Sequence, residues 1–232
     1  MNEIHPAPAD WRNAYAQSRP LAMLELLLLG AVTSIQFLGF GIQISPTLMV
    51  LGWLSLLLRR VGWRGIGMGR PALGWPRTIG WGLLAGLVAG ALSNWVFDPL
   101  VAMITSHPPD LSSFRPMIGN WRLLLVALTL SWTFAAFGEE IINRAYLCNR
   151  LTDIFGQRLD GKIIAVILSS ILFGSLHSYQ GTSGMLSTGL GGVMQCLAYY
   201  LSGRNLWVSI IMHGTLDTIG FALIYSGTMP GL

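Results

Sequence analysis

The chain has 232 residues, of which 53% are hydrophobic and only 10% charged, and its mean hydropathy is +0.58. Soluble domains carry about 25% charged residues, so a globule of this size could not cover its surface with so few charges. The composition excludes an ordinary soluble protein and predicts an integral membrane protein. We take the net charge of +4 as a topology signal, because Lys and Arg accumulate on the cytoplasmic side of membrane proteins. Nucleic acid is not an expected partner.

Apolar runs dominate the chain after a polar start. Residues 1–20 are predicted to form a cytoplasmic tail without a cleavable signal peptide. Residues 21–232 are predicted to form a single all-α membrane domain, a polytopic helical bundle of about seven transmembrane helices (range six to eight). A span needs roughly 20 apolar residues. The predicted spans cover residues 21–40, 47–58, 79–97, 121–151, 163–178, 185–201 and 206–225.

Two of these spans carry further information. In the third, Gly82, Gly86 and Gly90 recur every four residues, which predicts a seam that lets another helix approach closely. The fourth has some 31 residues, or about 46 Å at 1.5 Å per residue, so one of its ends must leave the hydrocarbon.

Basic residues are distributed unevenly between the two sides that seven spans would define. One side would hold only Arg115 and Arg122. The other would hold eleven basic residues, namely Arg12, Arg19, Arg59, Arg60, Arg64, Arg70, Arg77, Arg150, Arg158, Lys162 and Arg204. This asymmetry predicts a multi-pass protein of the cytoplasmic (inner) membrane, with the N-terminus in the cytoplasm and the C-terminus outside.

Ionisable residues are few within the predicted spans, where each costs roughly 2.5–3.5 kcal/mol on insertion scales. Glu139, Glu140 and Arg144 fall within six residues of one helix. Glu140 and Arg144 are four residues apart, as are His213 and Asp217, and this spacing places each pair on one helix face. Such a concentration of charge predicts either a functional site or an ion-pair network.

Helix geometry brings a further histidine to the same depth. If residues 152–162 form the turn of a straight hairpin, His177 and Glu140 lie within about 5 Å of each other along the axis. Glu139, Glu140, His177 and His213 can then share one polar cavity open to the cytoplasm. A glutamate beside a histidine can activate water, so the residues favour a hydrolytic site. A proton-coupled transporter and a purely structural network remain alternatives.

The remaining buried polar groups favour structural roles. Glu25 lies near the start of the first span and is expected to snorkel or to pair with an arginine. Cys148 and Cys196 are expected to be reduced, structural thiols.

Three motifs in order on three helices, Glu139-Glu140-x-x-x-Arg144, Phe173-x-x-x-His177 and His213-x-x-x-Asp217, resemble the CAAX prenyl protease and bacteriocin-processing family of intramembrane endopeptidases. The resemblance covers about residues 120–225, with the catalytic motifs in 121–225. It implies a helical bundle around an inward-facing cavity and hydrolysis of a peptide bond near the cytoplasmic face.

The resemblance also implies roles for the six residues. Glu139 would be the general base and His177 its partner on the water. His213 and Asp217 would stabilise the oxyanion, while Glu140 and Arg144 would shape the site. Asp217 stands where the best-understood members have Asn, and an ionised Asp would repel an oxyanion. Either Asp217 is protonated, or it orients His213 through the second ring nitrogen.

Metal-free chemistry is the favoured form of this mechanism. Two histidines and a glutamate can hold zinc, so a zinc-dependent peptidase with Glu139, His177 and His213 as ligands remains an alternative. The absence of a His-Glu-x-x-His motif from the sequence argues against it. A catalytically idle scaffold or immunity protein of the same fold is another alternative. The expected partners are the lipid bilayer and a peptide or protein substrate, with prenylated C-terminal peptides, leader peptides and membrane-associated proteins all open.

Overall fold

The computed structural model describes residues 18–35 and 44–232, and none of these residues lies in a β-strand. Most of the predicted N-terminal tail falls outside these ranges. The helical elements are α2 (Arg19–Ile35), α3 (Ile44–Leu58), α4 (Trp75–Leu92), η2 (Ser93–Phe97), α5 (Asp98–Thr105), η3 (Ser112–Met117), α6 (Trp121–Leu130), η4 (Ser131–Glu139), η5 (Ile141–Cys148), α7 (Asn149–Phe155), α8 (Leu159–Ser175), η6 (Ser178–Gln180), α9 (Gly181–Leu201) and α10 (Leu206–Ser226). The all-helical fold predicted from the sequence is thus confirmed for this part of the chain.

The long helices suit a membrane. By length and composition, three continuous helices could cross a bilayer, namely Trp75–Thr105, Trp121–Phe155 and Leu206–Ser226. Their outward surfaces are apolar: Trp95, Met103 and Leu130 are large, exposed hydrophobic residues. In a soluble protein such surfaces would be unstable in water, so the chain is an integral membrane protein.

The predicted count of seven spans, and its range of six to eight, is not supported. In addition to the three continuous helices, α8 and the helical residues Ser178–Leu201 are together long and apolar enough for a span, but they are bent by 61° relative to each other, as in a broken span or a re-entrant loop. The prediction had counted these two segments as separate spans. The first two predicted spans correspond in part to α2 and α3, whose described residues number 17 and 15. Residues 36–40 of the first predicted span lie outside the described ranges.

The predicted overlong fourth helix is present and is longer still, with 35 residues from Trp121 to Phe155. Its middle is wound as π-helix in η4 and η5. A π-helical turn contains an additional residue and is often found at functional sites. Glu139 and Glu140 lie at the junction of the two π-helical segments.

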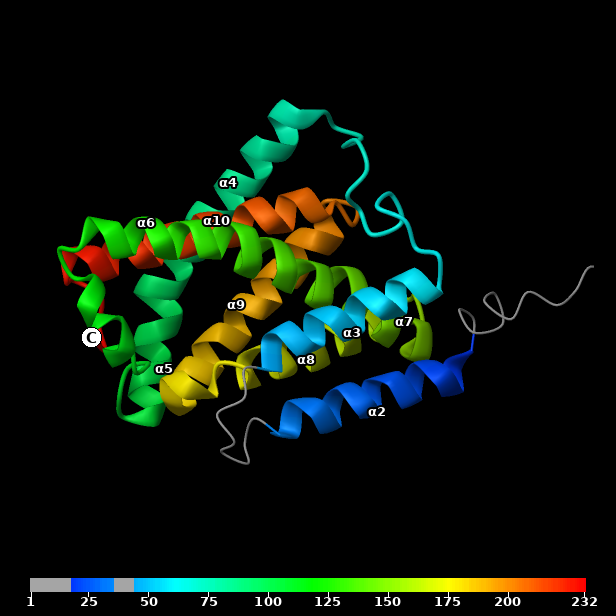
Figure 1. The fold of residues 1–232 in the computed structure, drawn as a ribbon, viewed down its shortest axis with the longest axis horizontal. Helices are drawn as coiled ribbons and strands as arrows, with labels where there is room; N and C mark the ends of the chain where they lie inside the picture. Colours follow the sequence, from blue (N-terminus) through cyan, green and yellow to red (C-terminus); the bar gives the residue numbers. More distant parts are fainter. Residues whose placement is uncertain (1–17, 36–43) are drawn as a thin grey trace, which may run out of the picture.

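The glycine seam predicted in the third span lies against α10. A Cβ atom at Gly82 would come within 2.6 Å of Ile211 Cβ, and one at Gly86 within 2.5 Å of Thr215 Cβ. Because no side chain fits in this space, the glycines allow α4 to pack closely along α10. Figure 1 shows α4 crossing α10 at one edge of the bundle, with α2 at the opposite edge. The seam therefore serves packing within the chain.

Candidate active site

Glu140 is the centre of a buried ionic cluster. Its side chain is fully buried, and its Oε2 atom lies 3.2 Å from Nε of Arg144 one turn along the helix. Its other oxygen, Oε1, is 2.9 Å from Nδ1 of His213 on α10. The predicted pairing of Glu140 with Arg144 is present, and Glu140 also joins its helix to α10.

Both ring nitrogens of His213 face carboxylates. Nδ1 is hydrogen-bonded to Glu140, whereas Nε2 is 3.6 Å from Oδ2 of Asp217, which is beyond the usual range of a hydrogen bond. The same Asp217 oxygen accepts a hydrogen bond of 2.5 Å from the hydroxyl of Ser131. Glu140 is therefore the carboxylate that orients the His213 ring, while Ser131 holds Asp217 close to the second nitrogen.

His177 lies where α8 ends and the chain bends toward α9. Its backbone N–H donates to the carbonyl of Gly174, and its ring Nδ1 lies 3.0 Å from the carbonyl oxygen of Phe173. A carbonyl oxygen only accepts, so Nδ1 carries the proton. In the neutral ring the lone pair is then on Nε2, which is the nitrogen that can accept a proton from water.

The aromatic ring of Phe173 connects the two histidines. It lies edge-on to both imidazoles, with centroid distances of 5.1 Å to His177 and 6.2 Å to His213. The guanidinium carbon of Arg144 is 5.1 Å from the centre of the same ring. Phe173 thus brings residues of all three sequence motifs into one neighbourhood.

Glu139 differs from its neighbour Glu140. Its side chain is only partly buried, and within residues 18–35 and 44–232 it makes no side-chain hydrogen bond or ion pair. Its backbone carbonyl accepts a hydrogen bond of 2.8 Å from the Asn143 amide. Of the two adjacent glutamates, Glu139 is the one whose carboxylate is not engaged by a cation.

Two residues of this cluster were missed in the sequence. Gln195 on α9 accepts a hydrogen bond of 2.6 Å from Arg144, and Ser131 donates to Asp217. Both are polar side chains inside otherwise apolar helices, and both are buried. Such residues need a partner when buried, and this requirement was the available signal.

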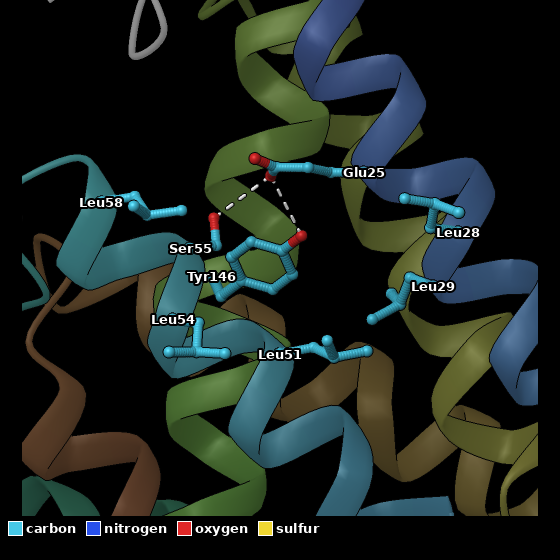
Figure 2. A pocket seen from close by; sticks show the side chains of 8 residues that line it. All are labelled: Glu25, Leu28, Leu29, Leu51, Leu54, Ser55, Leu58 and Tyr146. Atoms are coloured by element: carbon cyan, nitrogen blue, oxygen red, sulfur yellow. Dashed lines mark hydrogen bonds between the residues drawn. The ribbon is translucent and has the colours of Figure 1, made fainter. Parts of the chain in front are cut away.

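The predicted cavity open to the cytoplasm is not supported, because Glu140 and His213 are packed against each other and against Arg144. A pocket of about 250 Å³ lies elsewhere, between α2, α3 and η5. Figure 2 shows its lining residues, which are Glu25, Leu28, Leu29, Leu51, Leu54, Ser55, Leu58 and Tyr146.

The polar groups of this pocket satisfy one another. Glu25 forms a 2.8 Å ion pair with Arg59 and accepts hydrogen bonds from Ser55 and Tyr146 at 3.1 and 3.2 Å. The predicted pairing of Glu25 with an arginine is therefore present, and it links α2, α3 and η5.

The zinc alternative does not fit the arrangement. Within the described ranges, no three His, Cys, Asp or Glu side chains are grouped as they would be around a metal ion. In the alternative ligand set of Glu139, His177 and His213, Nδ1 of each histidine is hydrogen-bonded, to Phe173 and to Glu140, which would leave Nε2 of each ring to bind a metal.

Cys148 and Cys196 are free and buried, and their sulfur atoms are 3.5 Å apart. Cys148 lies on η5, one helical turn after Arg144, and Cys196 lies on α9, directly after Gln195. Ser169 on α8 is 3.4 Å from both sulfur atoms.

Comparison with known proteins gives one match. Residues 121–219 match the family model described as type II CAAX prenyl endopeptidase Rce1-like. No curated protein and no solved structure matches the chain. The matched segment contains all six predicted site residues, and it confirms the family resemblance that the three motifs carry.

Proposed function

We propose that this membrane protein is an endopeptidase that hydrolyses a peptide bond near the cytoplasmic face with water activated by Glu139 and His177. The family match over residues 121–219 supports a membrane peptidase of the CAAX protease kind. The observation that carries the assignment of the base is the difference between the two glutamates. Arg144 and His213 engage Glu140, so Glu139 is the carboxylate free to take a proton.

The proposed reaction begins at a water molecule held between Glu139 and Nε2 of His177. Glu139 takes a proton while the water oxygen forms a bond with the carbonyl carbon of the substrate. The carbonyl oxygen becomes an oxyanion. The C–N bond then breaks, and the proton on Glu139 passes to the leaving amine, so that Glu139 is regenerated.

His213 is proposed to stabilise the oxyanion. In the doubly protonated ring, Nδ1–H donates to Glu140, which holds the ring in one orientation and leaves Nε2–H as the remaining donor. A donor fixed before the reaction stabilises developing charge at little reorganisation cost. Asp217, held by Ser131, lies 3.6 Å from this nitrogen, and we assign it an electrostatic role toward the His213 imidazolium rather than that of binding the oxyanion.

A cleavage assay tests the proposal. The purified protein in lipid nanodiscs is incubated with matched peptides, prenylated and unprenylated, and the products are identified by mass spectrometry. We expect cleavage by the wild type and at least a hundredfold lower kcat in Glu139→Gln and His177→Ala, the order that general acid–base catalysis contributes. Full activity of either variant refutes the mechanism.

A matched control separates loss of the base from a general effect of neutralising a carboxylate in the membrane. Glu25→Gln changes another carboxylate in an apolar helix and should leave kcat unchanged. Loss of activity on chelation and its return with zinc would favour the zinc-dependent alternative. Flux of a solute into liposomes without peptide cleavage would favour the transporter, and neither activity would favour an idle scaffold.

We also propose a location in the cytoplasmic membrane, with the N-terminus in the cytoplasm and the C-terminus outside. The support for the N-terminus is the group of arginines before α4, because basic residues accumulate on the cytoplasmic side. The three continuous helices that could cross a bilayer are an odd number, which would place the C-terminus on the opposite side. A periplasmic reporter fused after Leu232 should be active, whereas a cytoplasmic reporter at the same position should not.

A further inference from the structure

Gln195 lies on a helix that contributes no residue to the three sequence motifs. It is in α9, and only 1% of its surface is exposed. An amide buried in an apolar environment is costly unless it is hydrogen-bonded. Its oxygen accepts from Arg144 NH2 at 2.6 Å, a short distance that is typical of a hydrogen bond assisted by charge.

Arg144 has few other hydrogen-bond partners. The same NH2 group donates to the carbonyl of Gly192 at 3.2 Å, whereas Nε and NH1 make no hydrogen bond within the described part of the chain. Nε is the atom that lies 3.2 Å from Glu140. The bond to Gln195 is thus the shortest contact that sets the orientation of this guanidinium.

The guanidinium group transmits that orientation because it is planar and rigid. When Gln195 fixes NH2, it also fixes the direction of Nε toward Glu140. Glu140 in turn holds Nδ1 of His213 through its other oxygen. A continuous series of contacts therefore runs from α9 through the helix of Glu140 to α10.

We propose that Gln195 is a positioning residue for the reaction, which acts through Arg144 and Glu140 to hold the His213 imidazole in its productive orientation. This inference rests on the proposed function. Gln195 is hydrogen-bonded to Arg144 and is not among the groups proposed to hold the water or the oxyanion, so we expect it to affect the rate of the chemical step and not substrate binding.

The test compares variants that keep or remove the acceptor. Gln195→Leu removes it, and kcat should fall about tenfold with KM unchanged within about twofold, the order expected for a hydrogen bond to a charged group. Gln195→Glu keeps an oxygen acceptor and should restore most of the lost kcat. Cys196→Ala, the matched control, alters the next buried residue of the same helix and should leave kcat unchanged. An unchanged kcat in Gln195→Leu overturns the proposal, as does an equal loss in Cys196→Ala.

If Gln195→Leu fails to fold, Gln195→Asn replaces it, because the shorter amide cannot reach Arg144 and should reduce kcat in the same way. A wild-type kcat in Gln195→Asn would overturn the proposal.

A second measurement does not depend on activity. In protein with 15N-labelled histidine, the His213 ring signals, assigned with a His213→Asn variant, should change in Gln195→Leu and remain unchanged in Cys196→Ala. If the wild type cleaves no peptide, the proposed function fails and these spectra alone decide the positioning role: unchanged His213 signals in Gln195→Leu refute it.

Discussion

Removal of the Arg144 charge should destabilise the protein strongly, and the structure indicates why. Glu140 and Arg144 have 0% and 1% of their side-chain surface exposed. Arg144→Met leaves the Glu140 carboxylate buried without its cation, and breaking a buried pair in this way costs about 3–5 kcal/mol. The hydrogen bond to Gln195 is lost as well. We expect the free energy of unfolding to fall by about 3–5 kcal/mol.

The double variant Glu140→Gln/Arg144→Met separates an unpaired charge from a loss of packing. Replacing both partners of a buried pair by neutral groups is often close to neutral for stability, so the double variant should recover at least half of the loss. Reversible unfolding in detergent micelles, followed by circular dichroism, measures both effects as a double-mutant cycle. A double variant as unstable as the sum of the two single variants would refute the reasoning.

Two further predictions concern packing outside the site. Gly86→Ala should cost about 1–3 kcal/mol of stability, because its Cβ would lie 2.5 Å from Thr215 Cβ. Gly80→Ala is the control and should not destabilise the protein, because a Cβ there would have nothing within 4 Å. Equal melting temperatures of the two variants would contradict this prediction. Glu25→Gln should lower the free energy of unfolding by about 2 kcal/mol, since buried Arg59 loses a charged partner. The same variant should leave kcat unchanged. A melting temperature equal to that of the wild type would contradict the structural role of the ion pair.

The helical class and the ionic pairs could be predicted because they depend on local spacing. Glu140 and Arg144 are four residues apart, so any regular helix brings them together. The pairing of Glu140 with His213 could not be derived in this way, since it depends on how α10 lies against η5. The same limit applies to Gln195, whose partner is 51 positions away along the chain.

The number of spans was wrong for a related reason. Hydropathy detects apolar segments, but it does not reveal the 61° bend between the segments on either side of His177. Nor does it show that Glu140 contacts both Arg144 and His213 directly, and the predicted cavity open to the cytoplasm is not supported among the described residues. The motifs indicated which residues meet, whereas tertiary packing determines how much room they leave for water.

The end of α8 has a consequence for how His177 variants are interpreted. The backbone N–H of His177 turns back to Gly174, and the imidazole N–H takes its place as the donor to the Phe173 carbonyl. The proton on Nδ1 of His177 therefore has two effects. It satisfies the Phe173 carbonyl at the end of α8, in an apolar environment, and it fixes which ring nitrogen is protonated. Truncation of His177 to alanine would expose an unsatisfied carbonyl as well as remove the imidazole. An asparagine, whose side-chain amide can still donate locally, is the substitution that removes the chemistry while retaining the helix terminus.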